Sequence, residues 1–90
     1  MSTLTIGRLS VEMYSKWAEF FLDGESVVDV PFGIFGPPNR FLVATLLLTA
    51  ASIQGSAPMI HPAIDAWAIA HRPDIESAMT VLATWPEQLS

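Results

Sequence analysis

The 90-residue chain contains no cysteine, which excludes disulfide bonds, thiolate metal sites and thiol chemistry. Basic residues are also scarce: four Lys and Arg side chains stand apart along the sequence, against nine acidic ones, and the formal net charge is −5. Nucleic-acid binding depends on clustered Lys and Arg that neutralise phosphates, so we expect no nucleic-acid partner. The nine carboxylates are also few and dispersed for a protein that imitates DNA with an acidic surface.

The sequence also lacks a stretch of about 20 apolar residues, the length that a helix needs to span a bilayer, so we expect no membrane partner. The first ten residues, MSTLTIGRLS, lack a basic segment followed by an apolar one, and we expect a cytoplasmic protein. The apolar run at residues 41–53, FLVATLLLTAASI, instead predicts a helix buried on most of its sides. A chain of this size buries only about 60 to 65 per cent of its unfolded surface. We therefore expect a homo-oligomer, with a dimer favoured, in which a second copy helps to cover this helix.

Caps and apolar spacing predict a single, mainly α domain over residues 1–90, a small four-helix domain. Ser10 and Gly24 are the start and stop signals of the first helix, and Pro62 suits the first position of the third. β-branched residues allow at most a minor two-stranded β element near the N-terminus, which pairs residues 3–6 with residues 25–32. The four helices are expected at residues 11–23, 39–55, 62–72 and 74–85.

The helix expected at residues 11–23 has a narrow polar arc and a wide apolar face rich in aromatic side chains. Such a face is most often part of a buried core, and a binding face is the less frequent alternative. Trp17 and Phe21 lie on it and are two of the expected partner-binding residues.

The loop at residues 32–39, FGIFGPPN, places three large apolar side chains among two glycines and two prolines. One interpretation is a rigid turn whose side chains fold back into the core. The other is a proline-stiffened loop that presents Phe32, Ile34 and Phe35 to a protein partner, with little entropy lost on binding. A phosphate site is disfavoured, because prolines lack the backbone donors of a phosphate cradle and no GxxxxGK[ST] pattern occurs.

Two histidines suggest metal binding or catalysis, but their spacing argues against both. His61 and Asp65 lie one helical turn apart, yet no third ligand stands at a suitable distance. His71 is expected to pack on Trp67 one turn back, and no nucleophile elbow such as GxSxG is present. We therefore expect no metal, no cofactor and no catalytic residues.

The surplus of apolar surface and the absence of an assembled chemical site favour a non-enzymatic protein–protein interaction module. Accessory subunits, assembly chaperones and inhibitors of the immunity or anti-defence type are of this kind. One alternative is a small-molecule-binding protein with an apolar cavity between the central helix and the aromatic face of the first. Another is a small enzyme built from His61, Asp65 and Arg72. No family resemblance and no internal repeat is visible in the sequence.

Overall fold

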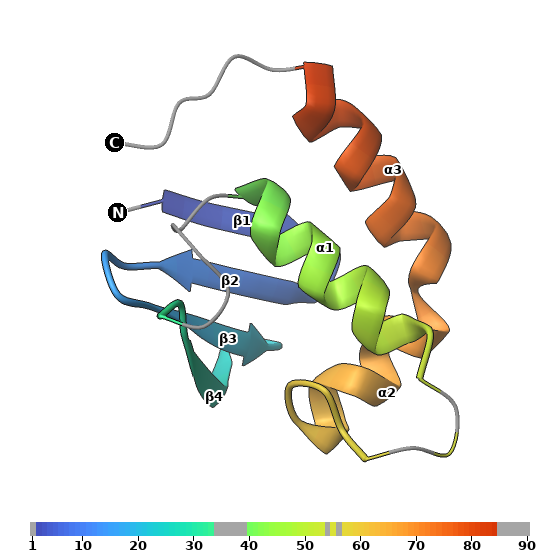
Figure 1. Ribbon diagram of the computed structural model, residues 1–90, viewed down its shortest axis with the longest axis horizontal. Helices are drawn as coiled ribbons and strands as arrows, with labels where there is room; N and C mark the ends of the chain where they lie inside the picture. The colour runs from blue at the N-terminus through green and yellow to red at the C-terminus, as the bar shows by residue number, and fades with distance from the viewer. Residues whose placement is uncertain (1, 34–39, 54, 56, 85–90) are drawn as a thin grey trace.

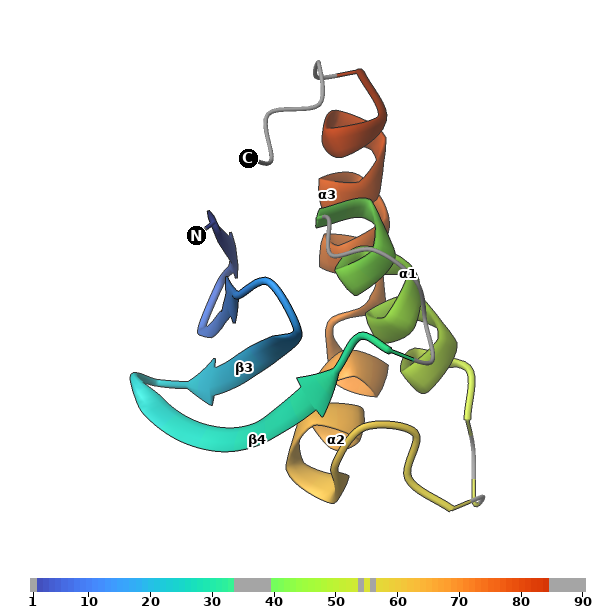
Figure 2. The ribbon, with the colours of Figure 1, turned by 60° about the vertical axis from the view of Figure 1, so that its left-hand side comes forward.

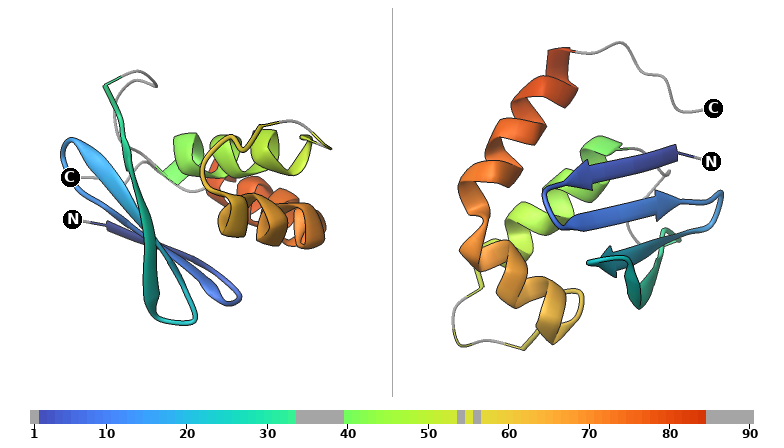
Figure 3. Two further views of the ribbon diagram at one scale, coloured as in Figure 1. Left: turned by 90° about the horizontal axis from the view of Figure 1, so that it is seen from below. Right: turned by 180° about the vertical axis from the view of Figure 1, so that it is seen from behind.

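The structure is a computed structural model that describes residues 2–33, 40–53, 55 and 57–84. Four strands come first and three helices follow (Figure 1). The strands form one antiparallel sheet in the order β1-β2-β3-β4, and the helices form a second layer on one face of it (Figure 3). The elements are β1 (Ser2–Ile6), β2 (Leu9–Met13), β3 (Trp17–Leu22), β4 (Glu25–Pro31), α1 (Arg40–Ala51), α2 (Pro62–Ala70) and α3 (Arg72–Thr84).

Two tight turns determine the register of this sheet. Asp23 and Gly24 join β3 to β4 with φ angles of 54° and 82°, and Leu22 pairs with Glu25 across them. Two successive positive φ values define a type I′ hairpin turn, for which Asp-Gly is a preferred dipeptide. Gly7 has a φ of 57° in the turn between β1 and β2, where Ile6 pairs with Leu9. These glycines place consecutive strands side by side.

The prediction of a mainly α four-helix domain is therefore wrong, because the first expected helix does not form. Residues 11–23 instead span most of β2, a turn and all of β3. Val11, Met13 and Phe20 are buried on the sheet face that meets the helices, and this alternation along each strand is the period of an extended backbone. The expected two-stranded element is also wrong, since β1 pairs with β2 and β4 pairs with β3.

The other three expected helices correspond to α1, α2 and α3. α1 is nearly apolar all round, and it is covered by the sheet on one side and by α2 and α3 on others. The sheet thus supplies cover that a four-helix domain of this size would lack. The need for a second copy over the central helix, from which we expected a dimer, is correspondingly smaller. The buried residues of α1 are Val43, Ala44, Leu46, Leu47, Ala50 and Ala51.

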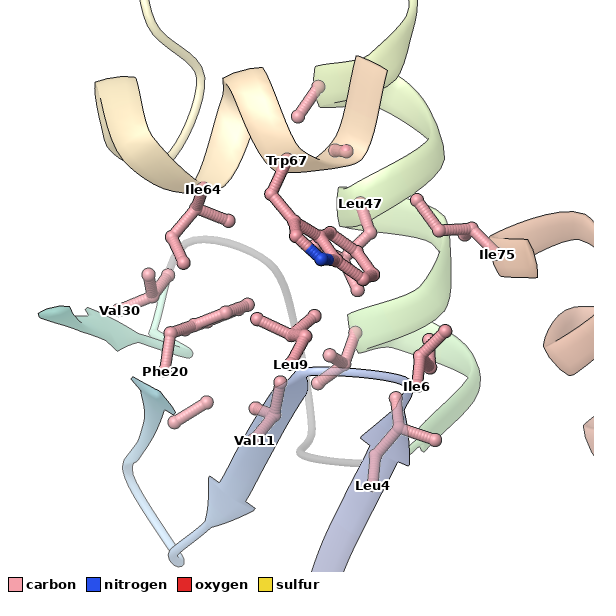
Figure 4. Packing of buried hydrophobic residues seen from close by; sticks show 14 of the residues in the cluster. Leu4, Ile6, Leu9, Val11, Phe20, Val30, Leu47, Ile64, Trp67 and Ile75 are labelled. Carbon is pink, nitrogen blue, oxygen red and sulfur yellow. The ribbon is translucent and has the colours of Figure 1, made fainter. Parts of the chain in front are cut away.

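One hydrophobic core lies between the two layers (Figure 4). Trp67 and Ile64 of α2 point towards the sheet, where Phe20 and Leu9 meet them, and Leu47 of α1 lies beside the indole ring (Figure 4). The registers of β3 and β4 shift between Phe20 and Phe21, and β4 curves towards the helices (Figure 2). A bulge of this kind increases local bending, which helps the sheet to wrap this core. Among the described residues, no helix has the length and apolarity that crossing a membrane requires.

Candidate interaction surface

The structure describes three of the five expected partner-binding residues, and these three differ in exposure. Phe32 lies in the hydrophobic core with 2% of its surface exposed, so we leave it out of the surface considered below. Ile34 and Phe35 lie outside the described residues. Trp17 is 39% exposed and Phe21 is half-buried. These two belong to one strand, β3, instead of one helix.

Trp17 and Phe21 lie on the face of the sheet that the helices leave open. Alternate residues of β3 share a face, and the buried Ala18 and Phe20 occupy the other one. Seen from behind, the sheet lies in front of α1, with none of the described helices over this open face (Figure 3). Glu19 stands between the two aromatic residues on the same face. The structure therefore confines Trp17, Glu19 and Phe21 to one exposed strip.

An aromatic pair marks one end of this strip. The rings of Tyr14 and Trp17 stack with their centroids 4.6 Å apart and their planes inclined by 21°. The turn that carries them is closed by a hydrogen bond of 2.8 Å from Tyr14 N to Trp17 O. The Tyr14 hydroxyl donates a hydrogen bond of 2.7 Å to Oε2 of Glu12 on β2. A hydrogen bond thus links the aromatic pair to the neighbouring Glu12 carboxylate.

Three carboxylates form a row across the open face. Glu12 pairs with Glu19 across β2 and β3, and Glu19 pairs with Asp29 across β3 and β4. Residues directly opposite in an antiparallel sheet have their Cβ atoms about 4.5 to 5.5 Å apart, and like charges at this spacing destabilise the sheet. The Ser26 hydroxyl donates a hydrogen bond of 2.6 Å to Glu19 Oε2. We call Glu12, Glu19 and Asp29 the acidic row, and these residues with Tyr14, Trp17 and Phe21 the acidic–aromatic surface.

The electrostatic effect of the acidic row extends to Tyr14. The hydrogen bond to Glu12 raises the pKa of the Tyr14 phenol, and partial burial and the charges of Glu12, Glu19 and Asp29 raise it further. All three carboxylates thus disfavour a further negative charge beside their row. A positively charged group placed there would be favoured for the same reason.

The ion pairs formed by Arg8 and Arg72 involve carboxylates outside the acidic row. Arg8 pairs with Asp23 at the hairpin tips, where Arg8 Nε donates a hydrogen bond of 2.7 Å to Asp23 Oδ1 and Nη2 contacts Oδ2. This hydrogen bond and the arginine charge lower the pKa of the Asp23 carboxyl, and Asp23 raises the pKa of Arg8 in return. Arg72 pairs with Glu76 on α3 at 3.2 Å.

Each of the three residues of the small-enzyme alternative forms a local hydrogen bond or ion pair. His61 caps α2, and its Nδ1 accepts a hydrogen bond of 3.1 Å from Ala63 N. Asp65 is 6% exposed, and its two carboxylate oxygens accept hydrogen bonds from the backbone N–H groups of residues 59 and 60, at 2.7 and 3.2 Å. Arg72 belongs to the ion pair with Glu76. Within the described part of the chain, no three His, Cys, Asp or Glu side chains are grouped as a metal site requires.

His71 packs on Trp67, as the sequence predicts. The two rings stack with centroids 4.6 Å apart and planes inclined by 10°, and His71 Nδ1 lies 2.9 Å from Trp67 O. The buried Trp67 Nε1 has no hydrogen-bond partner among the described residues. His71 therefore serves to hold the indole ring that fills the core between α2 and the sheet.

If the protein bound a small molecule, we expected an apolar cavity between the central helix and a helix at residues 11–23. Strands β2 and β3 occupy that segment, and the space between them and α1 is filled by core side chains such as Phe20 and Leu47 (Figure 4). A groove of about 370 Å³ does lie between α1 and α3, open to solvent. Its lining is mainly apolar and consists of Phe41, Leu48, Glu76, Met79 and Thr80.

Sequence reasoning missed the acidic row and Tyr14, although a signal was present. Residues 9–13, LSVEM, alternate apolar and polar side chains, and the Asp-Gly dipeptide at 23–24 is a strong hairpin signal. Together they would have indicated a strand on each side of residues 14–16, with Glu12 on one and Glu19 on the other.

The chain matches no protein-family model, and no curated protein or solved structure is significantly similar to it.

Proposed function

We propose that this protein is a non-enzymatic protein–protein interaction module that binds a basic partner protein through its acidic–aromatic surface. The observation that supports this proposal is the in-register row of Glu12, Glu19 and Asp29 on the open face of the sheet. We place the protein in the cytoplasm, the compartment that the sequence favours. Accessory subunits, assembly chaperones and inhibitors all act by such binding.

The acidic row supports a basic partner because it places like charges directly opposite one another. Like charges at directly opposite positions destabilise a sheet, so the row reduces the stability of the unbound fold. Arg or Lys side chains of a partner would neutralise the carboxylates and remove this cost on binding. Complementary charges also accelerate association and exclude partners of the wrong sign.

The aromatic residues beside the row supply the apolar contribution that charges alone lack. Trp17 is 39% exposed and stacks on Tyr14, so its ring is held in place before a partner arrives. Trp and Tyr are the residue types that most often carry binding energy at protein interfaces. A guanidinium group can stack on such a ring while it pairs with a neighbouring carboxylate. Arginine is therefore the partner residue that fits this surface best.

Binding of a dye-labelled peptide of alternating Arg and Ala, measured by fluorescence anisotropy, tests the proposal. The triple variant Glu12→Gln, Glu19→Gln, Asp29→Asn removes the charge of the row and keeps each side chain's shape. We expect its dissociation constant to rise at least about tenfold, the equivalent of about 1.4 kcal/mol.

A second triple variant, Glu25→Gln, Asp74→Asn, Glu76→Gln, is the matched control, because it removes the same charge from exposed positions outside the row. We expect less than about a twofold change for it, since these three side chains do not belong to the row and exposed charges are screened at physiological salt. Equal weakening in both variants would show that only net charge matters and would contradict the proposal. Unchanged affinity in the first variant would contradict it as well.

A further inference from the structure

The two edges of the sheet are built differently. The edge strand β4 carries Glu25 and Asp29, a shift in register opposite Phe20 and Phe21, and Pro31 at its end. Charges, bulges and proline are the features by which proteins prevent an additional strand from pairing with a sheet edge. The other edge strand, β1, has the sequence STLTI, without charge or proline, and it pairs with β2 in uninterrupted register. The edge of β1 therefore lacks all of these protections.

The register shows which backbone groups of β1 face outwards. Ile6 and Leu9 close a two-residue hairpin loop and so form a hydrogen-bonded pair. Hydrogen-bonded and non-hydrogen-bonded pairs alternate along an antiparallel ladder, so Leu4 also bonds to β2. The N–H and C=O groups of Thr3 and Thr5 then point away from β2, towards an edge on which no described strand lies.

We propose that the chain forms a homodimer in which the β1 strands of two copies pair antiparallel about a two-fold axis at Leu4. Thr3 of each copy then lies opposite Thr5 of the partner copy, and the outward groups of these residues form four N–H···O=C hydrogen bonds. Threonine meets threonine on the open face, which is a favourable cross-strand pair. Leu4 meets its own copy on the face that the helices cover. The two sheets become one, which strand addition at an exposed edge achieves in general.

Charge favours a second copy at this edge over the other one. Each copy carries a net charge of −5, so self-association needs a contact where carboxylates do not meet. β1 has no charged residue, whereas pairing through β4 would bring Glu25 and Asp29 of both copies together. The unprotected backbone and the absence of charge thus select the same edge. This dimer does not depend on the basic partner proposed above, since it uses a different part of the sheet.

Sedimentation velocity over a concentration series tests the dimer with the full chain. We expect the wild type to change from monomer to dimer as its concentration rises. Thr5→Pro removes one outward N–H donor but no bond to β2, and proline is tolerated on edge strands at such positions. We expect this variant to stay monomeric where the wild type is dimeric, with an unchanged circular dichroism spectrum. A wild type that remains monomeric at every concentration would overturn the proposal.

A double variant, Thr3→Lys and Thr5→Lys, keeps every backbone donor and decides the question should Thr5→Pro fail to fold. It places lysines opposite each other in the proposed dimer while it lowers the net negative charge of the chain, so a loss of dimer must come from the edge itself. Ser26→Lys, on the exposed β4 edge, is the matched control, and we expect it to dimerise like the wild type. A dimer that persists in the double variant, or that is lost in Ser26→Lys, would contradict the assignment to β1.

Discussion

Glu12 and Glu19 lie directly opposite each other on neighbouring strands, on the face of the sheet that no described helix covers. Asp29 extends this pair to a row across three strands, and the stacked rings of Tyr14 and Trp17 lie beside it. A row of like charges reduces the stability of the sheet that carries it. Functional sites can retain features that reduce stability, because activity can require them.

The central carboxylate of the row should be the one whose neutralisation stabilises the fold most. Glu19 faces a carboxylate on each side, and Gln retains an oxygen that can accept the hydrogen bond from Ser26. We expect Glu19→Gln to raise the free energy of unfolding by about 0.2 to 1 kcal/mol, measured by urea denaturation at neutral pH. Glu25→Gln, at the end of β4, is the control and should change it less. A Glu19→Gln variant less stable than the wild type would show that the row is not repulsive.

Tyr14, the single tyrosine of the chain, responds to the charges of the acidic row. Its pKa lies above the ordinary value of 10.0, first because of the hydrogen bond to Glu12. The raised pKa favours the folded state below pH about 10, and this contribution is lost as the pH rises through the pKa of the folded protein. We expect Glu12→Gln to move the Tyr14 pKa downwards, followed by phenolate absorbance during a pH titration. An unchanged titration curve would contradict this account of Tyr14.

Asp23 contributes to stability in two ways, through its ion pair with Arg8 and through its positive φ in the hairpin turn. Two substitutions separate these contributions. Asp23→Asn removes the charge and keeps a residue that accepts a positive φ, whereas Asp23→Ala loses both. We expect the melting temperature to fall more for Asp23→Ala than for Asp23→Asn.

Asp23 should also affect the pH dependence of stability. Because the folded pKa of Asp23 is lowered, its contribution is present above pH about 4 and is lost as the pH falls through that lowered pKa. The wild type should therefore lose more stability than Asp23→Asn on acidification below pH 4. Parallel acid profiles for the two proteins would show that the ion pair contributes nothing.

Asp65 should be a structural residue, because its buried carboxylate holds the backbone before α2. Asp65→Ala leaves the N–H groups of Met59 and Ile60 without their acceptor, and we expect a loss of about 1 to 3 kcal/mol in the free energy of unfolding. Asp65→Asn retains one carbonyl oxygen and should lose less. Asp74→Ala, at the exposed start of α3, is the control. An Asp65→Ala variant as stable as the wild type would contradict this role.

The three helices could be predicted because their signals are local. Pro62 and His61 define the start of α2, and the apolar run at residues 41–53 contains no Gly, Pro, Asn or Asp that would interrupt a helix. The sheet was missed because Trp17 and Phe21 are apolar residues on its open face. They hide the alternation of β3, and at helical spacing the same residues form an apolar arc.

The candidate surface could be predicted only in part, for the same reason. Trp17 and Phe21 were expected to bind a partner, yet their neighbours on the face depend on strand pairing. Glu12 and Asp29 are distant in sequence, and only the register through Glu19 brings them into one row. A helical interpretation keeps Glu12 and Glu19 on one polar arc but leaves Asp29 outside that helix, so a row across three strands was not visible. A hairpin turn at Asp23 and Gly24 alone would pair Glu19 with Val28, and only the register shift between Phe20 and Phe21 brings Asp29 opposite Glu19.

An NMR titration of the isotope-labelled protein with the alternating Arg–Ala peptide tests most directly whether the acidic–aromatic surface binds a basic partner. We expect the amide signals of Glu12, Glu19 and Asp29 and the indole signal of Trp17 to shift together and saturate, while the signals of α2 and α3 stay in place. Shifts concentrated on α2 and α3, with the acidic–aromatic surface unchanged, would contradict it.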